Sequence, residues 1–335
     1  MQGRSMASHH NGQPTPTMQL SPRLSLMLIL PPLMWAGNAV VGRLLVGSID
    51  PLWLNVARWA LALALLWPLG HRVWTSAAGR AQVRQRWPYL AALSLSGVGA
   101  YNALQYLALT TSTPLNVTLI AASTPVFAMA LGALVYAERP RKAQWLGALL
   151  SLLGVAVVLS RGSPARLLQV QLVIGDLVML CAVLCWAVYS WLLARPPAHM
   201  QGSAHPGWNW AELLSAQMLP GLAWALAIAS LGEWLAPSAP TQWSAKLWLA
   251  LAFIAVGPAL IAYRAWGLAV AQAGPAVATI FANLTPLFAA ILSAALLGEA
   301  PQAFHALAFG LIASGILASS WAMIRPQRVP PPGPP

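Results

Sequence analysis

The sequence has little charge: only 7% of its 335 residues are Asp, Glu, Lys or Arg, and only six residues are acidic. A soluble globular domain carries about a quarter charged residues, so this composition excludes a water-soluble fold. Apolar residues make up 59% of the chain, and its mean hydropathy is +0.66. A chain this apolar needs lipid as its solvent, and we therefore expect a membrane protein.

Cysteine is scarce as well. Cys181 and Cys185 share one apolar stretch, which is typical of reduced packing residues rather than of a disulfide framework. The six histidines lie in the N-terminal tail, in loops or near the start of an apolar run, and none has ligand spacing. We therefore expect no metal and no cofactor. The net charge of +12 is spread between apolar runs, which argues against a nucleic-acid partner.

Long apolar runs account for most of the chain. Each is long enough, at about 1.5 Å per residue, to cross a hydrocarbon layer of ~30 Å as a helix. Runs that do not alternate are unlike the strands of an outer-membrane barrel, so the sequence predicts an all-α membrane protein with ten transmembrane helices. The ten runs are 25–46, 51–69, 89–109, 115–136, 143–160, 173–193, 211–232, 248–271, 275–297 and 303–324.

The distribution of Lys and Arg predicts the orientation. If the N-terminus is cytoplasmic, twelve basic residues fall on the cytoplasmic side and three on the other, while Arg43, Arg58 and Arg264 lie within spans. An excess of basic residues marks cytoplasmic loops, so both termini of this multi-pass membrane protein are expected to be cytoplasmic. The polar segment 1–24 and the Pro-rich segment 325–335 are expected to be disordered tails.

An internal repeat is the most informative feature. A shift of 161 residues lays AASTPVFAMALGALVYAERP (121–140) over ANLTPLFAAILSAALLGEAP (282–301). Each copy holds five spans, an odd number, so the second copy enters the membrane from the opposite side. We therefore predict two inverted repeats, 25–160 and 173–324, joined by a linker at 161–172. The matched pairs include Thr124/Thr285, Pro125/Pro286, Phe127/Phe288, Glu138/Glu299, Pro140/Pro301, Pro114/Pro275 and Gly154/Gly315.

Several residues carry a family resemblance. They are the Trp-Ala-Gly-Asn of 35–38, Arg58 in the second span, and the Thr-Pro and Glu of spans four and nine. With two five-helix halves, this pattern resembles the EamA family of the drug/metabolite transporter superfamily. The resemblance implies ten helices, cytoplasmic termini, and export or exchange of small metabolites such as amino acids across the cell inner membrane of a bacterium. It does not identify the solute.

Polar and aromatic side chains inside the spans are the candidate solute contacts, because a buried polar group without a partner costs about 1–3 kcal/mol. Tyr101, Asn102 and Gln105 share one helix face. Helix-to-helix hydrogen bonding is the structural alternative for these residues, and core packing is the alternative for the two tryptophans. The candidates are Trp35, Asn38, Arg58, Tyr101, Asn102, Gln105, Asn116, Trp186, Tyr189, Tyr263 and Asn283.

Arg58 and the missing acids restrict the chemistry of the solute. Arg58 lies about seven residues, or roughly 10 Å, inside its span. Its partner there is a carbonyl, a water or an anionic group of the solute, and the alternative to a functional role is a structural one or snorkelling. No carboxylate occurs in a span interior, although carriers of cationic drugs need one. A neutral, zwitterionic or anionic solute is therefore favoured. Pro125 and Pro286 are expected to kink spans four and nine, either as hinges or as static bends.

The sequence supports a secondary transporter that exports small metabolites by alternating access, as a monomer or a weak homodimer whose partners are the solute and the lipid bilayer. A carrier of lipid or polyprenyl phosphate remains an alternative within the class. A membrane-embedded transferase is less favoured, because no buried His, Asp or Glu is present to act as acid or base. A scaffold or sensor has no need of inverted repeats.

Overall fold

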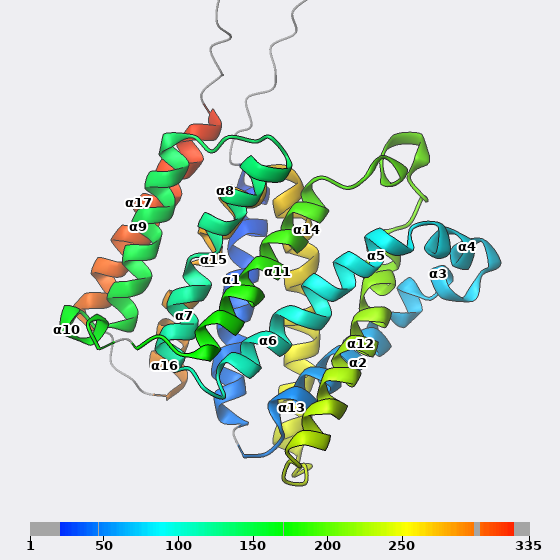
Figure 1. The fold of residues 1–335 in the computed structure, drawn as a ribbon, viewed down its shortest axis with the longest axis horizontal. Coiled ribbons are helices and arrows are strands. Elements are labelled where there is room, and N and C mark those ends of the chain that lie inside the picture. Colours follow the sequence, from blue (N-terminus) through cyan, green and yellow to red (C-terminus); the bar gives the residue numbers. More distant parts are fainter. Residues whose placement is uncertain (1–20, 46, 170, 298–301, 325–335) are drawn as a thin grey trace, which may run out of the picture.

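The computed structural model describes residues 21–45, 47–169, 171–297 and 302–324. Within these residues the fold is all-helical, as predicted (Figure 1). Both predicted tails lie largely outside the described part, although α1 begins at Pro22, before the predicted start at 25. Ser21 caps this helix by accepting a hydrogen bond from the Leu24 amide, and Pro22 occupies its first turn.

The first half of the chain contains the helical segments of five traverses. Two of these traverses are interrupted: the third passes from α5 through a π-helical segment into α6, and the fourth is divided into α7 and α8. The segments are α1 (Pro22–Leu44), α2 (Pro51–Gly70), α3 (Arg72–Thr75), α4 (Ala77–Gln85), α5 (Trp87–Leu93), π-helical Ser94–Ala100, α6 (Tyr101–Ala108), α7 (Pro114–Ala122), α8 (Thr124–Val135), α9 (Lys142–Leu159) and α10 (Pro164–Leu167).

The second half repeats this plan. Gly274, at φ +78°, forms the turn between α14 and α15, a backbone conformation that favours glycine. The segments are α11 (Ile174–Ala194), the short 3₁₀ turns Ala198–Met200 and Gly202–Ala204, α12 (Trp210–Leu235), α13 (Ala245–Ile254), π-helical Ala255–Ile261, α14 (Ala262–Ala273), α15 (Pro275–Ala282), α16 (Thr285–Leu297) and α17 (Ala303–Ile324).

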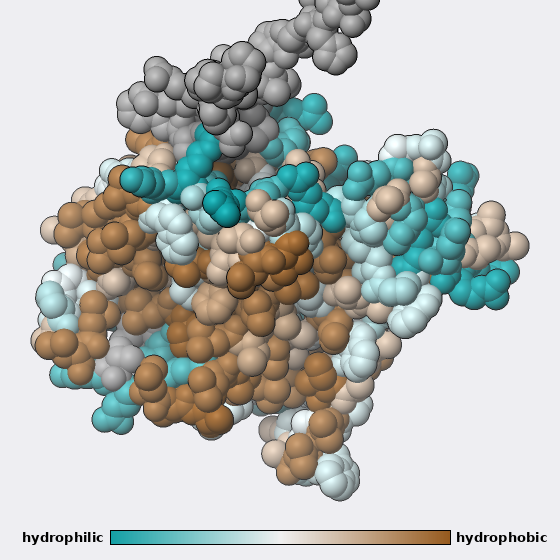
Figure 2. Space-filling view, turned by 45° about the horizontal axis from the view of Figure 1, so that its top comes forward, coloured by the Kyte–Doolittle hydropathy of each residue, from teal (hydrophilic) through white to brown (hydrophobic). Residues whose placement is uncertain are grey.

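Nine helical runs in the described part of the chain are long and apolar enough to cross a membrane. The third traverse is not among these nine. It is helical from Trp87 to Ala108, but its polar residues, including Asn102 and Gln105, lower its hydropathy. Large apolar side chains such as Leu134, Leu249 and Leu317 are exposed on the helical body. Figure 2 shows this apolar surface, with hydrophilic residues gathered along one rim and at one end. Such a surface is stable only in lipid.

The helices define two faces of the molecule. The N-terminal face is the one at which α1 begins and α2, α8, α11 and α14 end, and the far face is the one at which α1, α6, α9 and α12 end (Figure 1). The chain crosses between these faces five times in each half. An odd number of crossings requires the two halves to run in opposite directions, so the repeats are inverted.

The crossing of α9 and α17 shows the symmetry that relates the two halves. A Cβ atom added to Gly147 would lie 2.6 Å from the carbonyl oxygen of Gly315, and one added to Gly154 would lie 2.9 Å from that of Ala308. The shift of 161 residues equates Gly147 with Ala308 and Gly154 with Gly315. Gly147 therefore packs against the counterpart of Gly154, and Gly154 packs against the counterpart of Gly147, as expected for a pseudo-twofold axis.

Candidate functional site

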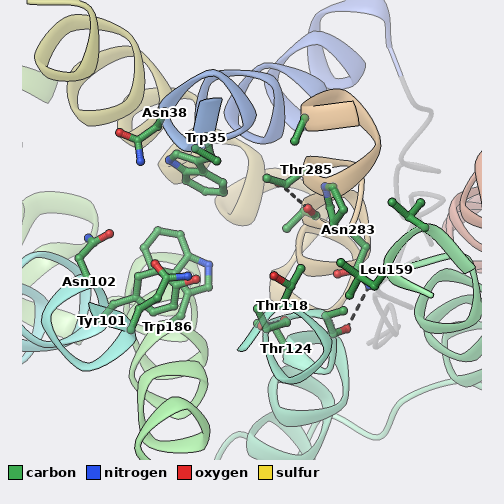
Figure 3. A pocket seen from close by; sticks show the side chains of 18 of the residues that line it. Trp35, Asn38, Tyr101, Asn102, Thr118, Thr124, Leu159, Trp186, Asn283 and Thr285 are labelled. Atoms are coloured by element: carbon green, nitrogen blue, oxygen red, sulfur yellow. Dashed lines mark hydrogen bonds between the residues drawn. The ribbon is translucent and has the colours of Figure 1, made fainter. Parts of the chain in front are cut away.

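A cavity of about 370 Å³ lies between the two halves, lined by residues of both. Its lining extends from mid-depth to the last turn of α9 at the far face, since Val158 and Leu159 are part of its wall. Figure 3 shows Trp35 and Asn38 of α1 on one side and Tyr101, Asn102 and Trp186 on the other. Ten of the candidates contribute to this wall: Trp35, Asn38, Arg58, Tyr101, Asn102, Gln105, Trp186, Tyr263, Asn283 and Pro286.

Two π-helical segments position the polar part of the wall. Ser94–Ala100 and Ala255–Ile261 are separated by the repeat shift of 161 residues, so both halves carry the same irregularity at the same place. Tyr101 and Asn102 follow the first segment directly, and Tyr263 follows the second. A π-helical turn inserts an extra residue, which rotates the helix face beyond it, and such turns are common at functional sites.

An aromatic cluster borders the cavity toward the N-terminal face. The rings of Trp35 and Trp186, one from each half, meet edge to face with centroids 5.2 Å apart. Trp266 lies 5.4 Å from both rings and is fully buried. Hydrogen bonds hold this layer: the Tyr263 hydroxyl donates to the Gly97 carbonyl at 2.6 Å, and the Trp266 indole N–H donates to Ser190 Oγ at 3.2 Å. These two hydrogen bonds fix the positions of the Tyr263 and Trp266 rings in a layer that is otherwise apolar.

The Thr-Pro pairs interrupt the fourth and ninth traverses beside the cavity. α7 ends at Ala122 and α8 begins at Thr124, while α15 ends at Ala282 and α16 begins at Thr285. Proline cannot donate to the preceding turn, and the carbonyls released there find side-chain donors. Thr285 Oγ1 donates to the Ala282 carbonyl at 2.7 Å, and Thr124 Oγ1 donates to that of Ala121.

Asn283 joins the two interrupted traverses. Its side-chain amide donates to the Ala122 carbonyl at 3.1 Å and to Ser151 Oγ. Ala122 and Asn283 are repeat counterparts, exactly one shift of 161 residues apart, so the interrupted traverses meet near the pseudo-twofold axis. Figure 3 shows Asn283 and Thr285 facing Thr118 and Thr124 at this end of the cavity.

Arg58 is the cationic residue among those that line the cavity. It is only 5% exposed, its Nη2 donates to Asn55 Oδ1 at 2.8 Å, and its guanidinium lies 4.9 Å from the centre of the Trp59 ring. Its buried Nε has no hydrogen-bond partner in the described part of the chain. None of the described residues that line the cavity is acidic. Arg264, in contrast, is exposed over the ring of Trp210, outside this wall.

Near the N-terminal face, α11 of the second half contacts α8 of the first. The buried Trp191 indole donates to the Ala128 carbonyl at 2.7 Å, and its ring stacks on Tyr136 with centroids 4.5 Å apart. Arg195, just after α11, forms an ion pair with Glu138, just after α8. These contacts lie between the cavity and the N-terminal face.

Three candidates lie outside the cavity wall. The Tyr189 hydroxyl donates to Gln217 Oε1 at 3.2 Å within the core. Pro125 is buried in the first turn of α8. Asn116 lies at the far face, where its amide donates to the Asp176 carboxylate at 3.2 Å. Glu299 falls outside the described residues.

Asp176 forms a buried cluster at the start of α11. It accepts hydrogen bonds from the Val173 amide at 2.9 Å, from Ser112 Oγ and from Asn116. This carboxylate therefore caps its helix and ties it to the start of the fourth traverse. In the described ranges, no group of three or more His, Cys, Asp and Glu side chains is placed to hold a metal ion.

Other lining residues were not singled out from the sequence. Trp266 is not part of the wall but packs on the lining residues Trp35 and Trp186, and its helical spacing, three residues after Tyr263, was the available signal. Two of the other wall residues, Thr124 and Thr285, belong to the repeated Thr-Pro motif but were not proposed as solute contacts. The rest are mostly small, and composition gives no sign of them: Ala39, Thr118, Ala121, Ala122, Val158, Leu159, Ala282 and Ala289.

Two inverted helical repeats that enclose a cavity lined by polar and aromatic side chains define a multi-pass membrane transporter. The model of the EamA-like transporter family matches residues 23–160 and 173–321, so the chain belongs to this family. Membership makes the protein a transporter rather than an enzyme, and the predicted fold class is confirmed.

Relatives support the same class. An uncharacterized transporter of Archaeoglobus fulgidus is 28% identical over 89% of this chain and 97% of its own length. The uncharacterized transporter YyaM of Bacillus subtilis is 24% identical over 81% of this chain and 85% of its own. The aromatic amino acid exporter YddG of Ancylobacter novellus is 25% identical over 76% of this chain and 85% of its own. One crystal structure matches with a TM-score of 0.70 and 21% identity, over 90% of this chain and 99% of that one.

Proposed function

We propose that this protein exports small metabolites, amino acids or related neutral, zwitterionic or anionic solutes, by alternating access. The observation that carries the proposal is a cavity lined by both inverted halves, which reaches the far face and is separated from the N-terminal face by an aromatic layer. Inverted repeats allow the mirror-image arrangement, in which the far face closes and the N-terminal face opens.

The size and lining of the cavity support an amino-acid-sized solute. Its volume of about 370 Å³ lies in the range of small-molecule sites, and it suits a small metabolite better than a lipid with its chains. Trp35, Trp186 and Tyr101 offer ring surfaces, while Asn38 and Asn102 offer amide groups. The relationship to an aromatic amino acid exporter favours solutes with a ring among the amino acids.

The proposal includes an orientation. Among the described residues, nine basic residues lie on the side of the N-terminal face, against three on the far side, and basic loops are cytoplasmic. Both termini are then cytoplasmic in the cell inner membrane, and the cavity in this structure extends toward the exterior. Export requires the opposite state to load solute from the cytoplasm.

The interrupted traverses are the hinges of this exchange. At both Pro125 and Pro286 a helix ends and another begins, so the backbone lacks continuous helical hydrogen bonds at matched places. Thr124 and Thr285 satisfy the released carbonyls locally, which lets each pair of segments bend without losing a hydrogen bond.

Counterflow in proteoliposomes tests the function. Purified protein loaded with unlabelled solute should take up labelled phenylalanine, tryptophan or another member of an amino-acid and organic-anion panel. Asn102→Ala and Trp35→Ala should each lower exchange at least about tenfold, since each removes wall contacts worth roughly 1.4 kcal/mol or more. Trp234→Ala, at a tryptophan 78% exposed on α12, is the matched control and should exchange like the parent. Normal exchange by both cavity variants contradicts this placement of the solute.

A further inference from the structure

We propose that Arg58 is the receptor for a carboxylate group of the solute, so that the transporter selects small carboxylates and rejects amines that lack one. This inference rests on the proposed function, because it assigns the chemistry of the same cavity. It is carried by the environment of one side chain, and by the positions of the acidic residues elsewhere in the fold.

Arg58 is buried at a depth where an uncompensated charge is costly. A charged group at mid-membrane costs about 2.5 kcal/mol or more unless it is paired or reaches the interface. Arg58 does not snorkel to the lipid interface: it is 5% exposed and lies against the cavity. Asn55 and the ring of Trp59 hold the guanidinium in place, but both are uncharged. The charge is therefore positioned by neutral groups rather than neutralised.

The described acidic residues are all bonded elsewhere. Glu138 pairs with Arg195, and Asp176 is held by Ser112, Asn116 and the Val173 amide. The three others are used at helix ends and loops. Asp50 caps α2, Glu212 accepts from the Asn209 amide, and Glu233 accepts from Trp53 and Ser238. None of these five carboxylates contacts Arg58, so the described part of the fold supplies no counter-ion for it, and we expect one to enter with the solute.

A carboxylate fits this position better than other groups. A guanidinium offers donors in a planar fork that matches the two oxygens of a carboxylate, and such charge-assisted pairs are stronger than neutral hydrogen bonds. The aromatic rings of Trp35 and Trp186 and the amides of Asn38 and Asn102 line the same cavity. A solute whose carboxylate pairs with Arg58 and whose ring or side chain contacts this wall uses both the charged group and the aromatic and amide groups. A cationic amine without a carboxylate would be repelled by Arg58 and would find no acidic partner among the described lining residues.

Paired ligands test the inference by binding. Thermal stabilisation of the purified protein in detergent is measured with L-tryptophan, indole-3-propionate, L-tryptophanamide and tryptamine. The two carboxylates should bind the parent at least tenfold more tightly than the two amines. Removal of the charge in Arg58→Gln should weaken carboxylate binding by about 10- to 100-fold, as expected for a hydrogen bond to a charged group, and leave the amines unchanged. Arg58→Lys should give intermediate carboxylate affinity.

A second arginine provides the matched control. Arg264 also lies within a traverse and over a tryptophan ring, but it is exposed and outside the cavity wall, so Arg264→Gln should bind carboxylates like the parent. The inference is overturned if acid and amide bind the parent equally, if neither carboxylate binds, or if Arg58→Gln weakens all four ligands by the same factor. The first comparison needs only the parent protein, so it holds even where a variant does not fold.

Transport and binding separate this inference from the proposed function. A parent that binds carboxylates selectively but exchanges no solute of the panel refutes the export proposal and leaves the receptor role of Arg58 standing. A parent that exchanges amides and acids at the same rate refutes carboxylate selection and supports a transporter with another recognition group.

Discussion

The contact between Trp191 and α8 should decide how often the N-terminal face opens. Trp191→Phe keeps the aromatic ring that stacks on Tyr136 but removes the indole donor, so the buried Ala128 carbonyl loses its 2.7 Å hydrogen bond. A neutral hydrogen bond contributes about 0.5–1.5 kcal/mol. If it exists only while this face is closed, its loss shifts the equilibrium toward the open state by a factor of about five for each 1 kcal/mol.

Cysteine accessibility measures this shift. Ala269 is fully buried on α14, between Trp266 and the N-terminal face, so Ala269→Cys should react with a thiol reagent only when that face opens. The native Cys181 and Cys185 are first replaced by alanine. Trp191→Phe should then raise the labelling rate roughly fivefold, in line with an open population that is larger by the same factor.

The control separates opening from general loosening. Trp234→Phe changes the same residue type at a site 78% exposed on α12, so it should leave the labelling rate unchanged. Equal labelling of Trp191→Phe and the parent would show that the Trp191 contact persists in both states. That result would refute the assignment of α8 and α11 as the closure of the N-terminal face.

Two further predictions concern packing and orientation. Gly147→Ala places a methyl group 2.6 Å from the Gly315 carbonyl oxygen and should destabilise the protein by about 1–3 kcal/mol. In the control Gly310→Ala the methyl group meets nothing within 4 Å, so the thermal midpoint in detergent should stay unchanged or rise. Equal midpoints for the two variants would contradict the close crossing of α9 and α17. Cysteines at 84 and 330 should label from the cytoplasmic side and a cysteine at 165 from the outside, and labelling of all three from one side would refute the proposed topology.

The traverses were the predictable part of this fold. The predicted runs 51–69, 275–297 and 303–324 begin at the same residues as α2, α15 and α17 and end within one residue of the observed helices. This agreement has a physical reason, because lipid requires long apolar segments that are helical over most of their length and leaves most polar residues for the ends. The inverted repeat was equally visible, since the odd number of spans in each copy is a topological constraint rather than a packing detail.

Local irregularities and tertiary partners were not predictable in the same way. The π-helical segments contain ordinary residues such as Ser94 and Ala255, so nothing in their composition separates them from α-helix. Asn116 was expected among the solute contacts, but it lies beside Asp176, a partner 60 residues away that the order of the chain does not reveal. The roles of the cavity residues stay predictions until binding and exchange are measured.

Some features of the fold are repeated in both halves, whereas others occur in one half alone. The interrupted traverses, the π-helical segments and the crossing of α9 with α17 occur in matched pairs. Arg58 has no such counterpart, because α12, the repeat equivalent of α2, contains no basic residue. Two states related by a pseudo-twofold axis require equivalent hinges, but a solute with one carboxylate requires only one receptor. A basic residue introduced at Leu219, the position one repeat shift from Arg58, should therefore add a positive charge without adding a second binding site for the solute.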